Sequence, residues 1–278
     1  MPRLAVLGHP VAHSRSPAMQ NAALAALGLG EEWSYEAIDV APEDFEARVR
    51  AMAGEGFAGA NVTVPHKEAA LALADVSSEV AREIGATNTL VFADGRVDAH
   101  NTDAGGLIAT LPGSPRARRA LVLGAGGAAR AAIWALSASG TVVDVSGVDV
   151  WNRTRARADA VYAELGRYVE LGGAPVESLR QDSYGIIVNT TAVGLHGEDP
   201  FAHLPLDRSG FDAEQVVVDM VYGDAPSPLL AAAESAGATT VDGLEILVQQ
   251  GALSLRIWTG REAPLDVMRT AAYSLGNS

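Results

Sequence analysis

The sequence predicts an α/β fold made of two α/β units. Strand-like and helix-like segments alternate along nearly the whole chain of 278 residues, which is the pattern of parallel α/β folds. A glycine-rich turn at Gly124–Gly127 stands between a strand-like run and a helix-like run, as in dinucleotide-binding units. The composition is 48% hydrophobic and 19% charged, which suffices for a buried core, and the length suits one large or two medium domains.

The first part of the chain supplies the elements of one unit. Ser16 stands at a helix N-cap position, and Pro65 ends the third strand because proline cannot donate to a strand ladder. Asp94-Gly95 is a strong two-residue turn signal between two strand-like runs. The predicted elements, in chain order, are strand Leu4–Gly8, helix Pro17–Leu27, strand Trp33–Asp39, helix Pro42–Met52, strand Ala60–Val64, the hairpin of Thr87–Phe92 and Arg96–His100, and helix Asp103–Leu111.

A second unit begins after a break at residues 111–115, Leu-Pro-Gly-Ser-Pro. Its predicted strands are Ala120–Leu123, Val148–Trp151, Ile186–Asn189 and Val216–Met220, and an alanine- and leucine-rich helix runs to Leu136. The pattern changes again near Thr240–Gly243, and two helices, Leu244–Thr259 and Pro264–Ser274, close the chain. A unit in the middle of the chain leaves these two helices free to return to the first unit.

The composition excludes several classes of protein. With 20 Lys and Arg against 34 Asp and Glu, the net charge is −14, which disfavours nucleic acid and anionic membranes as partners. The chain has no cysteine, so disulfides, thiolate metal sites and cysteine nucleophiles are excluded. No apolar run reaches about 18 residues, and the N-terminus lacks the apolar region of a signal peptide. We therefore expect a cytoplasmic protein without membrane spans.

The most informative segment is Gly59–Lys67, Gly-Ala-Asn-Val-Thr-Val-Pro-His-Lys. It places Lys67 at a strand-to-helix corner, where α/β folds position their ligand clefts. On this segment alone, a solvated lysine at a helix start explains the residue equally well. Asp103 lies at a similar junction after the hairpin, where it either caps the following helix or pairs with Lys67 to handle a proton.

Ser14 and Ser16 lie in a polar loop after the first strand. Residues two apart share a face of an extended chain, so the two hydroxyls beside a helix N-terminus form a candidate cradle for a carboxylate. Capping by Ser16 alone would not account for Ser14. His9 and His13 are four apart, but Pro10 prevents a regular helix between them. We therefore expect no metal site here.

A dinucleotide site is predicted by Gly124-x-Gly126-x-x-Ala129, which fits the G-x-G-x-x-G/A pattern in its required context between a strand and a helix. The next strand ends in Asn152-Arg153-Thr154, where NAD-binding sites usually have an acidic residue. Arg153 and the Thr154 hydroxyl suit a 2′-phosphate instead. A helix start with Thr154 as N-cap is compatible with the same residues, and NADP is the favoured cofactor.

These motifs belong to an ordered series that resembles the shikimate dehydrogenase family along nearly the whole chain. The matching segments are His13–Pro17, Asn61–Lys67, Gly85–Thr89, Asn101–Asp103, Gly124–Gly127, Asn152–Thr154, Asp219–Tyr222, Gln250 and Trp258–Gly260. Several positions depart from the family pattern: Gln20 replaces a histidine, Ala99 and Ala104 replace glycines, and Leu107 replaces an aromatic residue. None of these changes removes a chemical group with an expected role.

The resemblance implies an enzyme of aromatic amino acid biosynthesis that reduces 3-dehydroshikimate to shikimate with NADPH. It implies a discontinuous substrate domain, residues 1–103 with 239–278 returning to it, and an inserted Rossmann-like NADP-binding domain at 104–238. A homodimer is a possible assembly, and no metal is expected.

The resemblance also assigns roles to individual residues. Lys67 and Asp103 would be the catalytic pair. The substrate-binding residues would be Ser14, Ser16, Asn61, Thr63, Asn88, Tyr222 and Gln250. The cofactor-binding residues would be Gly124, Ala125, Gly126, Gly127, Ala128, Asn152, Arg153, Thr154, Met220 and Gly243.

Two other functions compete with this one. A quinate/shikimate dehydrogenase that uses NAD is disfavoured by Arg153 and by the lack of an acidic residue at the strand end. A non-catalytic ligand-binding or regulatory homologue would have no reason to keep both Lys67 and Asp103.

Overall fold

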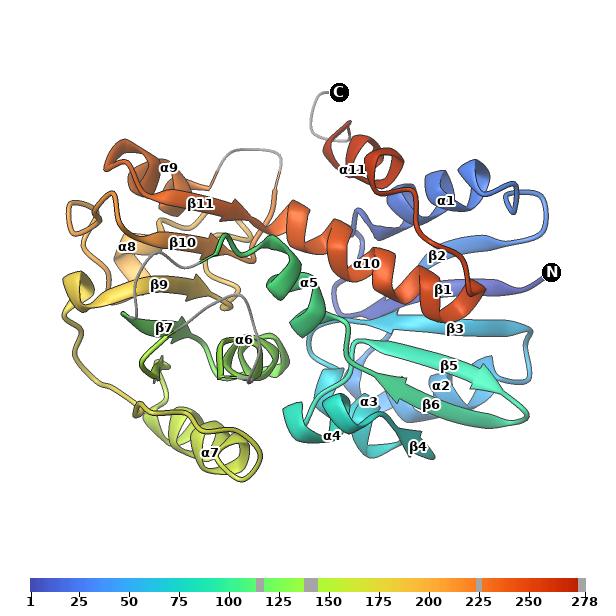
Figure 1. The fold of residues 1–278 in the computed structure, drawn as a ribbon. Helices are drawn as coiled ribbons and strands as arrows, with labels where there is room; N and C mark the ends of the chain where they lie inside the picture. The colour runs from blue at the N-terminus through green and yellow to red at the C-terminus, as the bar shows by residue number, and fades with distance from the viewer. Residues whose placement is uncertain (114–117, 138–144, 224–226, 275–278) are drawn as a thin grey trace. The chain divides into compact units, whose positions relative to one another are not determined.

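The computed structural model describes residues 1–113, 118–137, 145–223 and 227–274 (Figure 1). The chain forms two compact units, one of Met1–Gly106 with Leu247–Ser278 and one of Leu107–Ile246. It passes between them within α5 (Asp103–Thr110) and α10 (Gly243–Thr259), whereas the boundaries predicted from the sequence stand at residues 103 and 238. The last two residues of the predicted break at 111–115 lie outside the described residues.

The first unit is built on a six-stranded mixed sheet with the strand order β2-β1-β3-β5-β6-β4. The strands are β1 (Arg3–Gly8), β2 (Ser34–Asp39), β3 (Phe57–Val62), β4 (Val76–Ser77), β5 (Thr89–Ala93) and β6 (Arg96–His100). β1 runs parallel to β2 and β3, and β5 is antiparallel to both β3 and β6. The ends of β1, β3 and β6 and the start of β5 therefore share one edge of the sheet.

Both faces of this sheet are covered, and the alternation of side chains along β1 shows how. Leu4 and Val6 pack in a cluster with residues of α1 (Ser16–Ala26), α10 and α11 (Leu265–Ser274). Ala5 and Leu7 pack in a second cluster with α2 (Phe45–Met52) and the hairpin. Successive residues of a strand point to opposite faces, so this short apolar strand anchors both layers, and the two C-terminal helices belong to the first unit.

The hairpin confirms its predicted turn. Asp94 and Gly95 both have positive φ, 52° and 74°, as a type I′ turn requires. β3 ends at Val62 rather than at the predicted Val64. The chain nevertheless stays bonded to β1, because Thr63 N donates to Leu7 O at 2.8 Å and His9 N donates to Val64 O at 3.0 Å.

One local prediction for the first unit, the N-cap of α1, was wrong. Ser16 is the first residue of α1, and Arg15 holds the N-cap position without a side-chain cap bond. The Ser16 N–H instead donates to Ser14 Oγ at 3.3 Å, so the two serines contact each other before the helix starts. The predicted helix at Pro42–Met52 begins as the 3-10 turn η1 (Pro42–Asp44) before α2.

Three short elements of this unit follow the third strand. α3 (Lys67–Ala72) begins at Lys67 as predicted. β4 and α4 (Glu79–Ile84) were not predicted.

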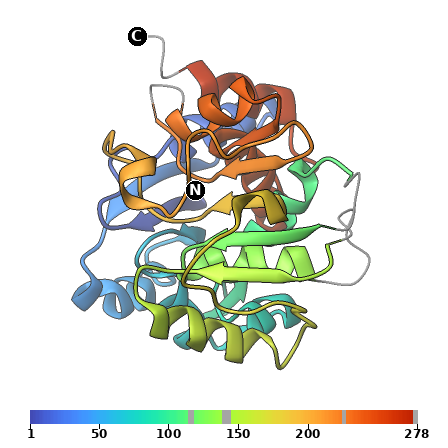
Figure 2. The ribbon, with the colours of Figure 1, turned by 90° about the vertical axis from the view of Figure 1, so that its left-hand side faces the viewer.

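The second unit is built on a five-stranded parallel sheet with the order β11-β10-β9-β7-β8 (Figure 2). Its strands are β7 (Arg119–Leu123), β8 (Val148–Trp151), β9 (Tyr184–Asn189), β10 (Val216–Asp219) and β11 (Thr239–Asp242). Its helices are α6 (Gly127–Ser137), α7 (Arg155–Leu165), η2 (Gln181–Ser183), α8 (Pro200–His203) and α9 (Pro228–Ser235). Read from β8, the order is 2-1-3-4-5, a doubly wound sheet whose direction of winding reverses between β7 and β9.

In the part of the chain that the structure describes, no helix is long and apolar enough to cross a membrane. The same residues contain no group of three or more His, Asp or Glu side chains placed to hold a metal ion. The five-stranded sheet and the six-stranded sheet agree with the predicted fold of two α/β domains.

Candidate functional site

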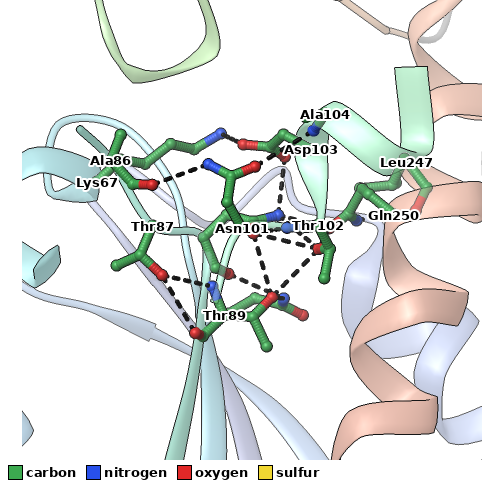
Figure 3. Close-up of polar contacts among 12 residues, drawn as sticks. Lys67, Ala86, Thr87, Thr89, Asn101, Thr102, Asp103, Ala104, Leu247 and Gln250 are labelled. Atoms are coloured by element: carbon green, nitrogen blue, oxygen red, sulfur yellow. Dashed lines mark hydrogen bonds and ion pairs between the residues drawn. The ribbon is translucent and has the colours of Figure 1, made fainter. Parts of the chain in front are cut away.

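The Lys67 ammonium and the Asp103 carboxylate form an ion pair in the first unit (Figure 3). Lys67 opens α3 just after β3, and Asp103 opens α5 just after β6, so the parallel direction of these strands brings both to one sheet edge. Lys67 Nζ lies 2.6 Å from Asp103 Oδ2, and their side chains are 13% and 12% exposed. Two opposite charges are thus held together with little contact to water.

Backbone bonds fix both ends of this pair. Thr87 N donates to Lys67 O at 2.9 Å, which ties the start of α3 to the segment before β5. Asn101 Nδ2 donates to Ala86 O at 2.9 Å, and Asn101 Oδ1 accepts from Ala104 N at 3.2 Å (Figure 3). Asn101 therefore satisfies a free N–H in the first turn of α5, and it sets the position of the Asp103 backbone.

Asn88 joins Asp103 to α10. Its Nδ2 group donates to Asp103 Oδ1 at 2.8 Å and to Gln250 Oε1 at 3.0 Å. Gln250 Nε2 in turn donates to Leu247 O at 2.9 Å. Asn88 and Gln250 are both buried, so this edge of the sheet carries amide groups beside the ion pair.

Asn61, near the end of β3, extends this group of hydrogen-bonded side chains away from the ion pair. Its Oδ1 atom accepts from the buried Tyr35 hydroxyl at 2.7 Å, and its Nδ2 group donates to Asn88 O at 3.0 Å and to Ser254 Oγ at 3.0 Å. The structure thus brings Asn61, Asn88 and Gln250 into one hydrogen-bonded cluster with Asp103.

The other predicted substrate-binding residues are placed differently. Ser14 and Ser16 precede and open α1, after β1, and Thr63 follows β3, so all three lie on connections at the same sheet edge as Lys67. Thr63 packs beside Gly8, where an added Cβ would lie 2.5 Å from Thr63 Cγ2. Tyr222 belongs to the second unit, just after β10.

Two of the histidines near this edge, His66 and His9, are already engaged. His66, directly before Lys67, is buried, and its Nε2–H donates to Val40 O at 2.7 Å, because a carbonyl only accepts. Burial lowers the pKa of the His66 imidazole, which favours its neutral form. His9 Nδ1 lies 2.6 Å from Asp39 Oδ1, and the hydrogen bond with His9 lowers the pKa of Asp39.

In the second unit, the glycine-rich turn has the geometry that its sequence pattern predicts. It follows β7 and opens α6 at Gly127. Gly124 has a φ of 122°, and a Cβ there would lie 2.4 Å from Thr190 Oγ1, whereas a Cβ at Gly126 would meet no atom within 4 Å. Glycine is therefore required by the fold at Gly124, while at Gly126 it leaves open space beside the backbone.

The loop after β8 carries the predicted cofactor-binding residues Asn152, Arg153 and Thr154. Thr154 holds the N-cap position of α7, but its side chain makes no cap bond. Arg153 is exposed and has no ion-pair partner among the described residues, whereas Arg155 pairs with carboxylates of Asp159 and Glu177 at 2.8 Å and 3.1 Å. The Arg153 guanidinium is thus available for an anionic ligand.

The one acidic residue on β8, Asp149, is not available for a ribose. It is buried and accepts from Arg119 Nε at 2.8 Å, from Ala174 N at 2.8 Å and from the Tyr184 hydroxyl at 3.0 Å. Burial acts to raise the pKa of the Asp149 carboxyl, but these bonds together lower it below its usual value. Asp149 is therefore a charged structural group inside the sheet.

Sequence reasoning missed a polar cluster at the ends of β9 and β10. Asp219 is buried, and burial raises the pKa of its carboxyl. Its oxygens accept from Asn189 Nδ2 at 2.9 Å, from Val221 N at 3.1 Å and from the Ser227 hydroxyl. The cluster fixes the chain just before Met220, and a Cβ at the predicted cofactor residue Gly243 would lie 2.6 Å from Met220 O. The sequence signal that could have revealed this cluster is a polar residue at the end of each of two apolar strands, Asn189 and Asp219.

Comparisons with known proteins match the whole chain to one family. The model of the shikimate dehydrogenase substrate binding domain matches residues 6–90, and that of the shikimate 5′-dehydrogenase C-terminal domain matches residues 243–273. A shikimate dehydrogenase (NADP(+)) of Anaeromyxobacter sp. is 45% identical over 287 residues, covering 98% of this chain and 96% of that protein. The protein of the same name from Brucella melitensis biotype 2 is 44% identical over 260 residues, with 92% and 88% covered.

A solved structure gives the same result for the fold. The shikimate 5-dehydrogenase of Thermus thermophilus, in complex with NADP(H) and shikimate, superposes with a TM-score of 0.84 at 42% identity, and 98% of each chain is covered.

Proposed function

Because the chain belongs to the shikimate dehydrogenase family, we propose that it catalyses the reversible reduction of 3-dehydroshikimate to shikimate with NADPH. The observation that carries this proposal is the Lys67–Asp103 pair, 2.6 Å between Nζ and Oδ2 and mostly shielded from water. The ammonium can give a proton to a carbonyl oxygen while a hydride adds to the carbonyl carbon. The carboxylate and the amides around the pair can bind the hydroxyls of the same ring.

The proton is supplied by Lys67 in this proposal. Addition of hydride to the 3-keto carbon develops negative charge on its oxygen, which needs a donor within hydrogen-bond reach. The Lys67 ammonium both stabilises that charge and donates the proton. Asp103 holds Nζ in place and accepts from a ring hydroxyl of the substrate. His66 is unsuited to the role, since its Nε2–H is committed to Val40 O.

The substrate is held by neutral polar groups around the pair. We assign Asn61, Thr63, Asn88, Tyr222 and Gln250 to the ring hydroxyls. Ser14 and Ser16 bind the carboxylate, and hydrogen bonds to a charged group are worth roughly 1.5–3 kcal/mol each. The net charge of the chain is −14, so an anionic substrate is retained by these local donors rather than by the overall field.

The second unit fits NADP(H), whose nicotinamide ring supplies the hydride when it is bound. Gly126 leaves room for a pyrophosphate beside the backbone, and the start of α6 offers free N–H groups to it. Gly124–Ala128 form this turn, while Asn152, Arg153 and Thr154 receive the 2′-phosphate. Met220 and Gly243 complete the cofactor contacts. The bonds of Asp149 with Arg119 and Tyr184 support NADP over NAD, because they occupy the one carboxylate on β8 and leave it unavailable to a ribose 2′-OH.

With this function, we expect the protein to act in the cytoplasm, where NADPH is available. We also propose that it forms a homodimer, which light scattering would test. The activity itself is tested by the nicotinamide absorbance with shikimate plus NADP⁺, then with NAD⁺, then with quinate plus either cofactor. We expect NADPH formation with shikimate and much weaker signals in the other mixtures. Equal rates with NAD⁺ and quinate would favour a quinate/shikimate dehydrogenase, and no reduction in any mixture would contradict an enzymatic role.

A further inference from the structure

Thr102 is a buried polar residue for which the mechanism above has no role. It is 3% exposed and directly precedes Asp103. Its N–H donates to Asn88 Oδ1 at 2.7 Å, and its Oγ1 atom lies 2.9 Å from Asn88 Nδ2. The same Oγ1 atom lies 3.4 Å from Gln250 Oε1 (Figure 3). Thr102 therefore contacts two amide side chains that are assigned to substrate binding, and the next residue in the chain is Asp103 of the proposed catalytic pair.

The backbone of Thr102 determines which way the Asn88 amide faces. An N–H group only donates, so the Asn88 atom at 2.7 Å from Thr102 N must be the carbonyl oxygen. The NH₂ group then points to Asp103 Oδ1, 2.8 Å away. The reverse orientation would set two donors against each other and an oxygen against a carboxylate. Thr102 thus fixes Asn88 as a donor to Asp103.

The hydroxyl of Thr102 is anchored from behind by α10. It lies 3.0 Å from Ser254 Oγ and 3.2 Å from Thr89 Oγ1, and either partner of each pair can be the donor. Ser254 is fully buried and also accepts from Asn61 Nδ2 at 3.0 Å. A hydroxyl can turn its hydrogen without moving its oxygen. The Thr102 oxygen is therefore one of three acceptors around the two hydrogens of Asn88 Nδ2, and its own hydrogen can go to Gln250, Ser254, Thr89 or Asn88 Oδ1.

We propose that Thr102 is a positioning residue for substrate binding, which holds the Asn88 and Gln250 amides in the orientation that meets the ring hydroxyls. This inference rests on the function proposed above. The backbone N–H of Thr102 remains in every side-chain variant, so the hydroxyl is the group that can be tested. Loss of the hydroxyl should weaken shikimate binding and leave cofactor binding unaffected, because its contacts with Asn88, Gln250, Ser254 and Thr89 lie in the first unit.

Thr87 offers a matched control for the test. It is fully buried in the same unit, but among the described residues its hydroxyl bonds only to backbone atoms of Thr89 and His100. Thr102→Val and Thr87→Val each remove one hydroxyl and keep a β-branched shape. From the worth of one neutral hydrogen bond and its effect on two amides, Thr102→Val should raise KM for shikimate about 5- to 20-fold, with a smaller change in kcat. Thr87→Val should lower thermal stability and leave that KM within about twofold of wild type.

A serine variant distinguishes a positioning role of the Thr102 hydroxyl from a packing role of the side chain. Thr102→Ser restores the hydroxyl and should return KM for shikimate to within about threefold of wild type, and KM for NADP⁺ should not move in any of these variants. Equal KM shifts for the two valine variants, or no rescue by serine, would show that Thr102 serves only the fold. If Thr102→Val does not fold, Thr102→Ala takes its place, and an unchanged KM for shikimate there overturns the inference.

Measurements on the wild-type protein distinguish failure of the proposed function from failure of the positioning role. A wild-type protein that neither oxidises nor binds shikimate, the latter by titration calorimetry, would overturn the proposed function and this inference together. An active wild type with equal valine variants would overturn the positioning role alone.

Discussion

The polar cluster of the first unit and the glycine-rich turn of the second, the two proposed ligand sites, are built in opposite ways. In the cluster, Asn61, Asn88 and Gln250 are oriented by one another and by buried hydroxyls before any ligand arrives. In the turn, Gly126 contributes open space and bare backbone. Substitutions should therefore damage the first site by removing polar atoms and the second by adding a single carbon.

The largest effect should follow from breaking the ion pair. Lys67→Ala should lower kcat about 10²–10⁴-fold, the usual range for a positioned acid or base, and substrate affinity should fall far less. Asp103→Asn should lower kcat as well. Steady-state rates of the double variant should be less than additive, because the two groups act as one unit. Strict additivity would mean that Asp103 binds substrate independently of Lys67.

The next largest effect concerns the two serines. Ser14→Ala with Ser16→Ala should raise KM for shikimate by about 100-fold or more, since two hydrogen bonds to a carboxylate are lost at roughly 1.5–3 kcal/mol each. KM for NADP⁺ should stay near the wild-type value. An unchanged KM for shikimate would show that the contact between Ser14 Oγ and Ser16 N only shapes the start of α1.

Arg153 tests the second unit by removing a charge. Arg153→Ala should raise KM for NADP⁺ about 10- to 100-fold and leave KM for NAD⁺ almost unchanged, because only NADP⁺ carries the 2′-phosphate. Arg155→Ala is the matched control, since Arg155 is paired with Asp159 and Glu177. Equal losses with both cofactors would mean that Arg153 has a structural role and does not select the cofactor.

The two glycines of the turn sharpen the comparison with the smallest change. Gly126→Ala should leave thermal stability almost unaltered and raise KM for NADP⁺ about tenfold, because the new methyl occupies space and meets no protein atom. Gly124→Ala should also destabilise the fold by about 1–3 kcal/mol, given its φ of 122° and the contact with Thr190 Oγ1. Thermal melts of the two variants, with and without NADP⁺, separate these effects.

Much of the fold could be predicted because buried strands carry strong signals. Val148–Trp151 has the predicted bounds, and the Asp94-Gly95 turn has the expected backbone. α4 could have been found, since Ser78 caps it through Ala81 N and Gly85 ends it with a φ of 73°. β4 has only two residues, too few for a periodic signal. β11 has one apolar residue among its four, whereas the equally short β8 has three.

The site residues likewise differ in how well the sequence predicts them. Lys67 and Asp103 stand at strand-to-helix junctions, which a sequence reveals, and the parallel direction of β3 and β6 brings both to one sheet edge, where their charged atoms lie 2.6 Å apart. Thr102 and Ser254 carry no pattern of their own. Their roles depend on α10 returning to the first unit, so that residues 152 positions apart lie 3.0 Å from each other. Such tertiary contacts are not encoded in local spacing.

The central claim is that proton transfer belongs to Lys67, while binding of both ligands depends on other residues. Titration calorimetry of the Lys67→Ala protein with shikimate and NADP⁺, paired with its rate of shikimate oxidation across pH 7–10, tests this claim most directly. We expect both ligands to bind with affinities close to those of wild type while turnover is almost lost at every pH. Retention of most of the turnover would contradict the claim and move the proton donor to Tyr222 or a histidine.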